Sequence, residues 1–535
     1  MRSPSSRAGL ILVALLLLLQ FGLRARAITA LPAFVDEHSH ITRARVAYAF
    51  DYNPTLTSHG KLLLYYWIGL FDPRADGDVG LMLSRLSIAL FSLLSGAAAA
   101  AIARDLFGRG AMLPALAFYV LLPFALFFDR MALADSFAGA LAALAVWSSV
   151  RLARRPTVGR GAVAGVLLAL ASLAKLTTAL LVALPLITVL LLDDGPRAES
   201  WRDAIRRLWR RYGGAWRAAA LSFLEVWSVV LALALASVLA GNEPILLDRH
   251  LVDEATSVAS LADKLDDFGE RLEYLISIPM TLILAGLVLL ALGRRPRAIG
   301  VPLAWLLLLW GPLIVIAVVI QSRYLMVGSP ALAVLFGGGV AVAGETLAGR
   351  WRWATARTLT ALLALGLLGG WALGFALPFA ANAISDPAAL RLPDRDYYDY
   401  YRNVFNTWGI RQSLDYLRAH GERNDGQIHA IGVVVHCSTL RLHMTPDFDW
   451  DCVDRWDFPS QRVQADPNRW PLVGEAAARW PVVYVISEYP QHLPLDAPPV
   501  GGPLRWSLEF TFARPHGGQM VAVWRVSAVQ EGADS

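Results

Sequence analysis

The stretch GLILVALLLLLQFGLRARAITALPAFVDEHSH, residues 9–40, carries the pattern that decides the fold of this chain. An apolar run over 9–23 is followed by two arginines and then by two adjacent carboxylates, Asp36 and Glu37. Such a run predicts a membrane-spanning helix, because about 20 apolar residues cross the hydrocarbon core. The acidic pair would then lie where the chain leaves the membrane, either in a solvated loop or at the centre of a reaction.

The composition extends this pattern to the whole chain. Of its 535 residues, 56% are hydrophobic and only 17% are charged, whereas soluble domains have about 25% charged residues. The net charge is +5, but the arginines cluster between apolar runs, as in RLARRP at 151–156. Cytoplasmic loops have this distribution under the positive-inside rule. We therefore expect a membrane protein and no nucleic-acid partner.

Eleven apolar runs predict an α-helical polytopic protein with about eleven transmembrane helices. They are residues 9–23, 79–103, 111–128, 132–150, 161–174, 176–192, 219–240, 272–292, 300–320, 324–345 and 357–379. With Arg2 and Arg7 in the cytoplasm, the arginine-rich segments all fall inside, provided that 161–192 forms two helices broken near Lys175. One unbroken helix would bury this lysine in mid-bilayer, which is unfavourable.

The first run has two interpretations. Ala25-Arg26-Ala27 resembles a signal-peptidase site, which would remove the run, and the alternative is an uncleaved first span. Both leave the sidedness of the later segments unchanged. We expect the uncleaved span, in an integral protein of the inner (cell) membrane with a cytoplasmic N-terminus.

The C-terminal region, 380–535, is polar and differs from the transmembrane domain, 1–379. Its patterns predict a helix over 408–421 and strands over 428–435, 481–488, 504–514 and 520–526. They indicate a small α/β domain on the extracytoplasmic side. Cys437 and Cys452 suggest one disulfide in an oxidising compartment, with two unpaired thiols as the alternative.

The first outer loop, 24–78, contains two candidate interfacial helices. Residues 40–52 are amphipathic, and 59–71 form an aromatic-rich apolar stretch that is too short to span the membrane. Asp36 and Lys61 would then lie at the starts of two helices on the membrane surface, bordering a cavity at the lipid interface.

With this topology, the outward-facing segments collect polar residues of both signs. Carboxylates there could accept a proton, and cations could hold a phosphate. Charges within or beside apolar spans are functional candidates. These residues are Asp36, Glu37, His38, His40, His59, Lys61, Arg85, Asp129, Arg130, Asp135, Lys175, Arg323 and Tyr324.

Three motifs follow the acidic pair in a fixed order: GKLLLYYW at 60–67, DRMALADSF at 129–137 and SRYLMVGSPALAVL at 322–335. In this order the chain resembles the membrane glycosyltransferases that use polyprenyl-phosphate sugars, which have the GT-C fold. These include the protein O-mannosyltransferases and the lipid A aminoarabinose transferases. The family pattern G-K/H-P-P-L-x-Y lacks its prolines here. The resemblance covers roughly residues 9–345.

The resemblance implies a polyprenyl-phosphate-linked sugar donor, a lipid, glycan or protein acceptor, and a site on the non-cytoplasmic face. Asp36 would be the general base of a displacement that inverts the sugar configuration, and Glu37 would hold the acceptor or a neighbouring cation. The residues implied in binding the donor phosphate are Lys61, Arg130, Lys175, Arg323 and Tyr324. Supporting roles fall to Arg85, Asp135 and His59.

Other interpretations of these residues stay open. His38 and His40 could take part in a divalent metal site, or they could be histidines at the headgroup boundary. The exposed cations could instead reach lipid phosphates. For the whole chain, the alternatives are a transporter or lipid flippase, with Lys175 and Glu225 lining a path, and a non-catalytic sugar-lipid-binding relative.

Overall fold

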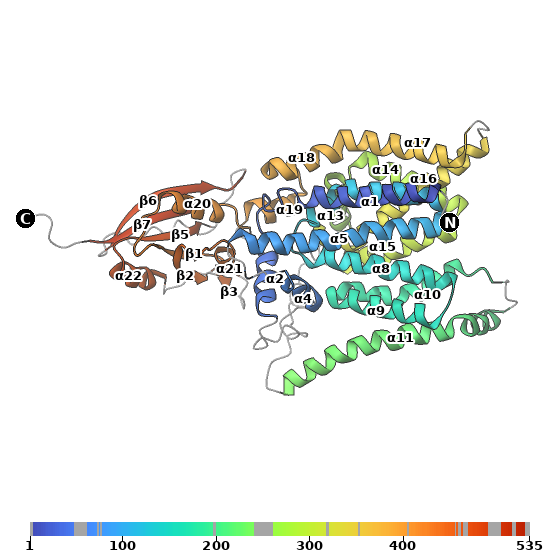
Figure 1. Ribbon diagram of the computed structural model, residues 1–535, viewed down its shortest axis with the longest axis horizontal. Coiled ribbons are helices and arrows are strands. Elements are labelled where there is room, and N and C mark those ends of the chain that lie inside the picture. Colours follow the sequence, from blue (N-terminus) through green and yellow to red (C-terminus); the bar gives the residue numbers. More distant parts are fainter. Residues whose placement is uncertain are drawn as a thin grey trace, which may run out of the picture.

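A long helical part is followed by a smaller C-terminal domain built around a β-sheet (Figure 1). The computed structural model describes residues 4–47, 61–71, 74, 77–195, 200–239, 260–316, 320–350, 354–403, 406–454, 456–457, 462–463, 469–489, 504–515 and 520–529. His59 and Gly60 lie outside the described residues.

The helical part runs from α1 to α18, and each of the eleven apolar runs overlaps at least one of its helices. The helices are α1 (Pro4–Ala25), α2 (Val35–Val46), α4 (Leu62–Gly69), α5 (Asp78–Phe107), α6 (Arg109–Leu121), α7 (Pro123–Phe128), α8 (Ala134–Arg154), α9 (Val158–Ala174), η1 (Leu176–Ala183), α10 (Leu184–Leu192), α11 (Trp201–Leu239), α13 (Leu261–Leu275), α14 (Ile278–Arg294), α15 (Pro296–Ile316), η4 (Ser322–Gly328), α16 (Ser329–Arg350), α17 (Ala356–Trp371), η5 (Ala372–Ala376) and α18 (Leu377–Ser385).

Among the described residues, seven helices are long and apolar enough to cross a membrane. The pair α13 and α14, bent by 104°, passes the same test when it is taken as one unit. Three further apolar helices of 10–17 residues cover 109–121, 158–174 and 176–192. The protein is therefore polytopic and helical, as its apolar runs predict, while the number of eleven spans stays a prediction.

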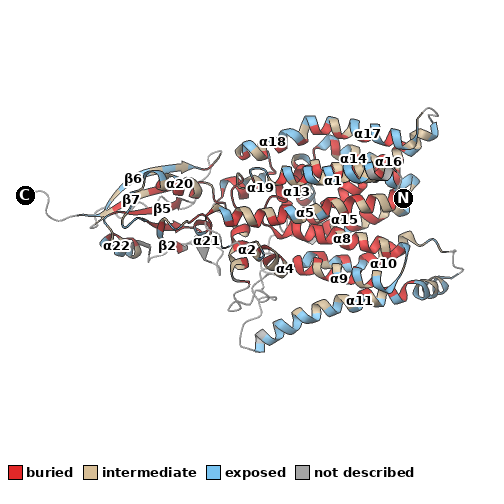
Figure 2. Ribbon diagram, viewed as in Figure 1, coloured by how far each residue is buried: buried red, intermediate tan, exposed pale blue. Residues whose placement is uncertain are grey.

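The helices bury their small and aromatic side chains inside the bundle and expose leucines on its outside. Figure 2 shows buried residues along α5, α8 and α16 and exposed ones along α1, α11 and α17. An apolar outer surface suits contact with lipid. Close packing of α9 on α11 depends on Gly161 and Gly165, where an added Cβ would lie 2.0 and 2.1 Å from backbone oxygens of α11.

The helix break predicted near Lys175 is confirmed. Helix α9 ends at Ala174, and Lys175 has an extended backbone with φ −159° and ψ 122°. The 3-10 helix η1 follows at Leu176. The break therefore ends one helix and places the lysine at the junction between two helical segments.

The C-terminal domain has a five-stranded sheet with a helix on each face, and a separate sheet of two short strands. Its elements are α20 (Ile410–His420), β1 (Ile428–Val434), α21 (Cys437–Arg441), β2 (Phe448–Asp454), β3 (Trp456–Asp457), β4 (Arg462–Val463), α22 (Arg469–Arg479), β5 (Val483–Tyr489), β6 (Leu504–Ala513) and β7 (Met520–Ala528). The strand order is β2-β1-β5-β7-β6. Strand β1 is parallel to β2 and β5, and β7 is antiparallel to β5 and β6. Helices α20 and α22 contribute to two separate apolar cores on the opposite faces.

The predicted helix and four strands of this domain are confirmed, but the sequence did not predict β2, β3, β4, α21 or α22. Strand β2, FDWDCVD, lies at the sheet edge, and its aspartates are unfavourable in strands. Cys437 in α21 and Cys452 in β2 are joined by a disulfide. The helix missed by the sequence, α22, has its apolar residues on one side only.

Hydrogen bonds join the C-terminal domain to the segment between α1 and α2. Ala33 and Thr407 are linked twice, by Ala33 N–H donating to the threonine hydroxyl and Thr407 N–H donating to the Ala33 carbonyl, both at 3.0 Å. The connecting segment contains η6 (Pro387–Ala389), α19 (Asp394–Tyr397) and η7 (Tyr398–Arg402). The boundary expected at residue 380 falls within α18, so the helical part extends a few residues further than expected.

Candidate active site

Asp36 lies in the first turn of α2, which begins at Val35 rather than at residue 40 as expected. The N-cap residue is Phe34, and its backbone N–H donates to Glu37 Oε2 at 3.0 Å. This contact replaces the missing side-chain cap, and two carboxylates in the first turn are favoured by the helix dipole. The local sequence therefore starts a helix that presents Asp36 and Glu37 in different directions.

Asp36 forms an ion pair with Arg323, with 2.7 Å between Oδ2 and Nη1. The Asp36 side chain keeps 29% of its surface exposed, whereas Arg323 keeps 8%. Burial raises the pKa of Asp36, but the positive charges of Arg323 and Lys61 more than offset burial and hold the pKa well below its usual range. The result is an ionised, partly accessible carboxylate beside fixed cations.

Lys61 is the N-cap residue of α4, as expected for the start of the second interfacial helix. Its Nζ donates to His40 Nε2 at 3.2 Å, and His40 Nδ1 donates to the Ala132 carbonyl at 2.9 Å. Burial and the charge of Lys61 hold the pKa of His40 well below its usual value. Burial also lowers the pKa of Lys61, although Asp36 opposes this effect. A neutral imidazole thus positions the ammonium group beside Asp36.

Lys175 brings a second ammonium group to the same place. It forms an ion pair with Asp135 of α8, and its Nζ lies 4.2 Å from the centre of the Tyr324 ring. Tyr324 also contacts the guanidinium of Arg323, which lies 5.4 Å from the ring centre. Lys61 interacts electrostatically with Asp36, Arg323, Lys175 and Asp135. Residues 36, 61, 135, 175, 323 and 324, which we call the Asp36 cluster, therefore meet although they are distant in sequence.

Glu37 lies outside this cluster and is fully buried. Arg85 Nε donates to Oε1 at 2.8 Å and Nη2 donates to Oε2 at 2.7 Å, while the Ala132 N–H donates to Oε1 at 2.8 Å. Arg85 also donates to the carbonyls of residues 28, 31 and 32. Both carboxylate oxygens of Glu37 accept hydrogen bonds within the protein, and its expected role in holding the acceptor or a cation stays a prediction.

Arg130 does not join the Asp36 cluster either. Its guanidinium donates to the carbonyl of Ala383 at 2.7 Å and to those of Arg26 and Ala27 at 3.0 and 2.8 Å. These bonds tie the loop before α8 to the end of α1 and to α18. Two of its three nitrogens are thus engaged by backbone carbonyls, and its expected role in binding the donor phosphate stays a prediction.

The chain is similar to one protein family and to several solved structures. Residues 77–211, less than half of the chain, match the profile of the family described as dolichyl-phosphate-mannose-protein mannosyltransferase. No curated protein matches the chain significantly. ArnT from Cupriavidus metallidurans in the apo state superposes with a TM-score of 0.55 at 14% identity, covering 97% of this chain and 98% of ArnT. The chain has the GT-C fold.

Two other solved structures are similar to this GT-C chain. ArnT from Cupriavidus metallidurans bound to undecaprenyl phosphate has a TM-score of 0.53 at 16% identity, with 97% and 98% of the two chains covered. The Archaeoglobus fulgidus oligosaccharyltransferase complex with Zn and sulfate has a TM-score of 0.45 at 14% identity, with 89% and 68% covered. The resemblance seen in the motifs is confirmed, and the family match and the fold together support a membrane glycosyltransferase.

His38 and His40, the two histidines of α2 that could take part in a metal site, both contact protein groups. His38 Nδ1 and the Ser438 hydroxyl of α21 are 2.6 Å apart, and the His38 ring lies 5.7 Å from that of His436. His40 is occupied by Lys61 and Ala132. Within the described ranges, no group of three or more His, Cys, Asp or Glu side chains is arranged to hold a metal ion.

The segment that follows α18 adds an aromatic side chain, Tyr400, that the predicted site did not include. The Tyr400 ring lies 4.7 Å from that of Phe34, and the Arg323 guanidinium lies 4.9 Å from the Phe34 ring. Burial raises the pKa of Tyr400 well above its usual value, against the effect of Arg323. The signal that could have found it is the cluster of four tyrosines over 397–401, which Asp399 divides into two pairs.

Proposed function

We propose that this chain is an integral membrane glycosyltransferase that transfers a sugar from a polyprenyl-phosphate donor to a lipid, glycan or protein acceptor. The observation that carries the proposal is the ionised and partly exposed Asp36, 2.7 Å from Arg323 and beside Lys61. A base next to several cations is the arrangement that this reaction needs. ArnT bound to undecaprenyl phosphate has the same fold, which supports a donor of this class.

Asp36 would act as the general base. Its carboxylate removes the proton from the acceptor hydroxyl as that oxygen attacks the anomeric carbon of the sugar. The bond between the anomeric carbon and the phosphate oxygen breaks, and its electron pair stays on the departing polyprenyl phosphate. Because attack and departure take place on opposite sides, the sugar configuration is inverted.

The cations of the Asp36 cluster would stabilise the leaving group. Arg323, Lys61 and Lys175 come from three different segments, and their positions are fixed by Phe34, His40 and Asp135 before the donor binds. Fixed charges of this kind stabilise the transition state without reorganising. Glu37 and Arg85 would act only by positioning α2, and Asp135 and Tyr324 by positioning Lys175.

Arg323 gives the base a second property. While it pairs with Asp36, it holds the pKa of that carboxyl low, which makes the carboxylate a weak base. A donor phosphate that takes hydrogen bonds from the guanidinium weakens this pair. The pKa of Asp36 then rises toward its usual value, so the base would become stronger when the donor is bound.

We place the Asp36 cluster and the C-terminal domain on the non-cytoplasmic side of the inner membrane, with the N-terminus in the cytoplasm. The clustering of arginines on the opposite side supports this orientation, and so does the disulfide of the C-terminal domain. The first span would stay attached, because Arg24 of α1 forms a fully buried ion pair with Asp129 at 2.8 Å. Its removal would leave a buried carboxylate without its partner.

The reaction is tested by deleting the gene and profiling lipid-linked and envelope glycans by mass spectrometry. We expect one sugar to disappear from one glycan, which identifies donor and acceptor together. The wild-type gene should restore it and the Asp36→Asn variant should not, at equal protein levels. Intact glycans combined with altered transport of another compound would contradict the proposal and favour a transporter.

The orientation is tested with a thiol reagent that does not cross membranes. In intact cells, Cys437 and Cys452 should react only after reduction. Reaction without prior reduction would contradict the oxidising, extracytoplasmic location of the C-terminal domain.

A further inference from the structure

A cavity of about 360 Å³ lies in the C-terminal domain and shares no residue with the Asp36 cluster. One wall is the face of the sheet at its β2 edge. His429 is the register partner of Asp449, and Ile431 is that of Asp451. Alternate residues of a strand project to the same face of a sheet, so two carboxylates of β2 stand beside two side chains of β1 along this wall.

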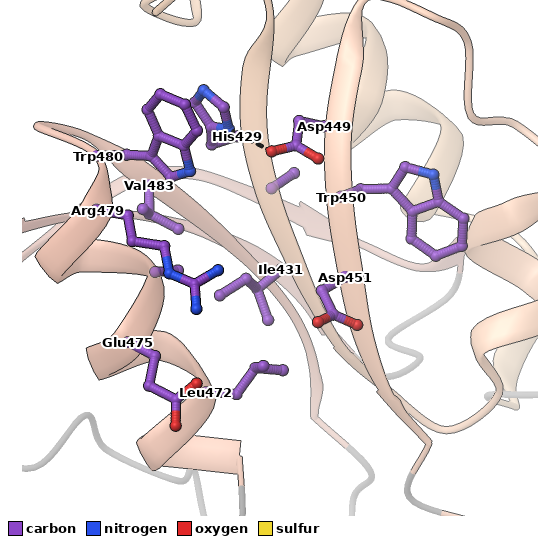
Figure 3. A pocket seen from close by; sticks show the side chains of 12 residues that line it. His429, Ile431, Asp449, Trp450, Asp451, Leu472, Glu475, Arg479, Trp480 and Val483 are labelled. Atoms are coloured by element: carbon purple, nitrogen blue, oxygen red, sulfur yellow. Dashed lines mark hydrogen bonds and ion pairs between the residues drawn. The ribbon is translucent and has the colours of Figure 1, made fainter.

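Helix α22 forms the opposite wall. Val473 and Ala477 pack into a core with residues of β1, β5 and β7, and none of the core residues described there comes from β2. The helix therefore covers the centre of the sheet and leaves the edge strand open on this face. Figure 3 shows Arg479 of α22 and Asp451 of β2 pointing toward the space between them, with Glu475 at the rim and the Trp450 ring directed away.

An aromatic ring closes one end of the cavity. Trp480 follows α22 directly, and its ring lies over the His429 imidazole with 3.8 Å between centres and 14° between planes. His429 Nδ1 in turn contacts Asp449 Oδ2 at 2.9 Å. The indole, the imidazole and the carboxylate thus support one another and hold the ring in a fixed orientation.

We propose that this cavity binds a saccharide that is neutral or carries amino groups, at a site separate from the Asp36 cluster. An aromatic ring can pack against the C–H face of a sugar ring, while carboxylates and a guanidinium bond its hydroxyls in pairs. The volume is within the range of ligand pockets. The carboxylates of Asp449, Asp451 and Glu475 outnumber the single guanidinium of Arg479, and this balance repels anionic sugars.

A peptide fits this cavity less well. Peptides that add to a sheet pair with the open backbone edge of an outer strand, whereas this cavity lies over the face of the sheet, where β1 and β2 are paired with each other. The recognising groups are side chains on the face of the sheet. They suit a compact ligand with many hydroxyls more than an extended chain.

Binding is tested by saturation-transfer NMR on the full-length protein in detergent, with three probes. They are the trisaccharide of β-1,4-linked glucosamine, its fully N-acetylated form, and trigalacturonic acid. We expect the glucosamine trisaccharide to bind most tightly, the acetylated form more weakly, and the acid not at all. Trilysine serves as the peptide probe and should not compete with the glucosamine trisaccharide.

Variants assign the signal to the cavity. Trp480→Ala should weaken binding by about tenfold or more, as for buried aromatic anchors elsewhere, and Asp451→Asn by roughly threefold for the amino sugar. Trp506→Ala is the matched control, because Trp506 packs against the same core as Trp480 but does not line the cavity. Because Asp451 is exposed, its substitution should leave the fold intact.

The proposal is overturned if no trisaccharide binds, if binding is the same in Trp480→Ala, Asp451→Asn and wild type, or if trilysine competes. Binding should persist in Asp36→Asn, since the cavity does not depend on the transfer reaction. Failure of transfer and failure of this site are therefore measured separately.

Discussion

Asp36 and Glu37 are neighbours in sequence, and each forms an ion pair with an arginine at 2.7 Å, but the two pairs differ in how far they are buried. The region around Asp36 is partly open and contains cations from three segments, with a pair distance of 2.7 Å to Arg323. The region around Glu37 is fully buried, and the Arg85 guanidinium there is fully engaged with the carboxylate and with backbone carbonyls. An ion pair that is buried and fully hydrogen-bonded within the protein stabilises the fold, whereas one that is partly exposed to solvent can also interact with a ligand.

The largest effect on transfer is expected from a substitution of Asp36. Asp36→Asn keeps an oxygen for Arg323 but cannot take up a proton, so kcat should fall by about 10³-fold, within the range of roughly 10²–10⁴ for general bases. Thermal unfolding should change little, because the side chain is partly exposed. The measurement is sugar transfer by the purified protein. A kcat near that of the wild type would remove Asp36 from its role as the base.

Glu37 should show the opposite behaviour. Glu37→Gln leaves the buried Arg85 without a countercharge, and breaking such a pair costs about 3–5 kcal/mol. We expect a large fall in the unfolding temperature in detergent. The double variant Glu37→Gln with Arg85→Gln is the control and should recover part of the loss. A stable single variant with abolished transfer would instead make Glu37 a reacting group.

A third carboxyl group, that of Asp396, should make the stability of the protein depend on pH. It is buried and accepts a hydrogen bond from Ser322, and burial raises its pKa to about 6. The unfolded chain releases this proton at lower pH than the folded protein does. The contribution of Asp396 to stability should therefore be fully present below about pH 4 and should fall by about 3 kcal/mol as the pH rises past about 6.

The measurement is the unfolding free energy between pH 4 and 7 for the wild type and for Asp396→Asn. The variant cannot ionise, so this part of the pH dependence should disappear. An equal fall in both proteins would show that another group is responsible.

The smallest effect on the reaction is expected when one cation of the Asp36 cluster, Lys175, is replaced. Lys175→Ala removes one charge from the Asp36 cluster and should raise the KM for the donor by about tenfold, the equivalent of roughly 1.4 kcal/mol. Lys175→Arg keeps the positive charge, so its KM should rise less than that of Lys175→Ala. Arg130→Gln is the matched control, since its contacts are backbone carbonyls and it should reduce stability without changing KM. An unchanged KM in Lys175→Ala would exclude Lys175 from donor binding.

Much of the fold was accessible from the sequence because lipid imposes strong local rules. A spanning segment must be apolar and helical along its whole length, so the apolar runs mark the helices and the arginines indicate their direction. The same rules predicted the break at Lys175 and the helix start at Lys61. In the C-terminal domain, apolar and β-branched runs indicated β1, β5, β6 and β7, whereas the edge strand β2 alternates apolar residues with aspartates, which are unfavourable in strands.

The residue types available to the site, and their order along the chain, follow from the amino-acid sequence alone. Their roles depend on the folded chain, in which Arg323 faces Asp36, Arg85 faces Glu37, and Arg130 contacts backbone carbonyls. Local rules fix only a helix and its direction. Which cation meets which carboxylate depends on packing between segments hundreds of residues apart, and a single sequence does not encode those distances locally.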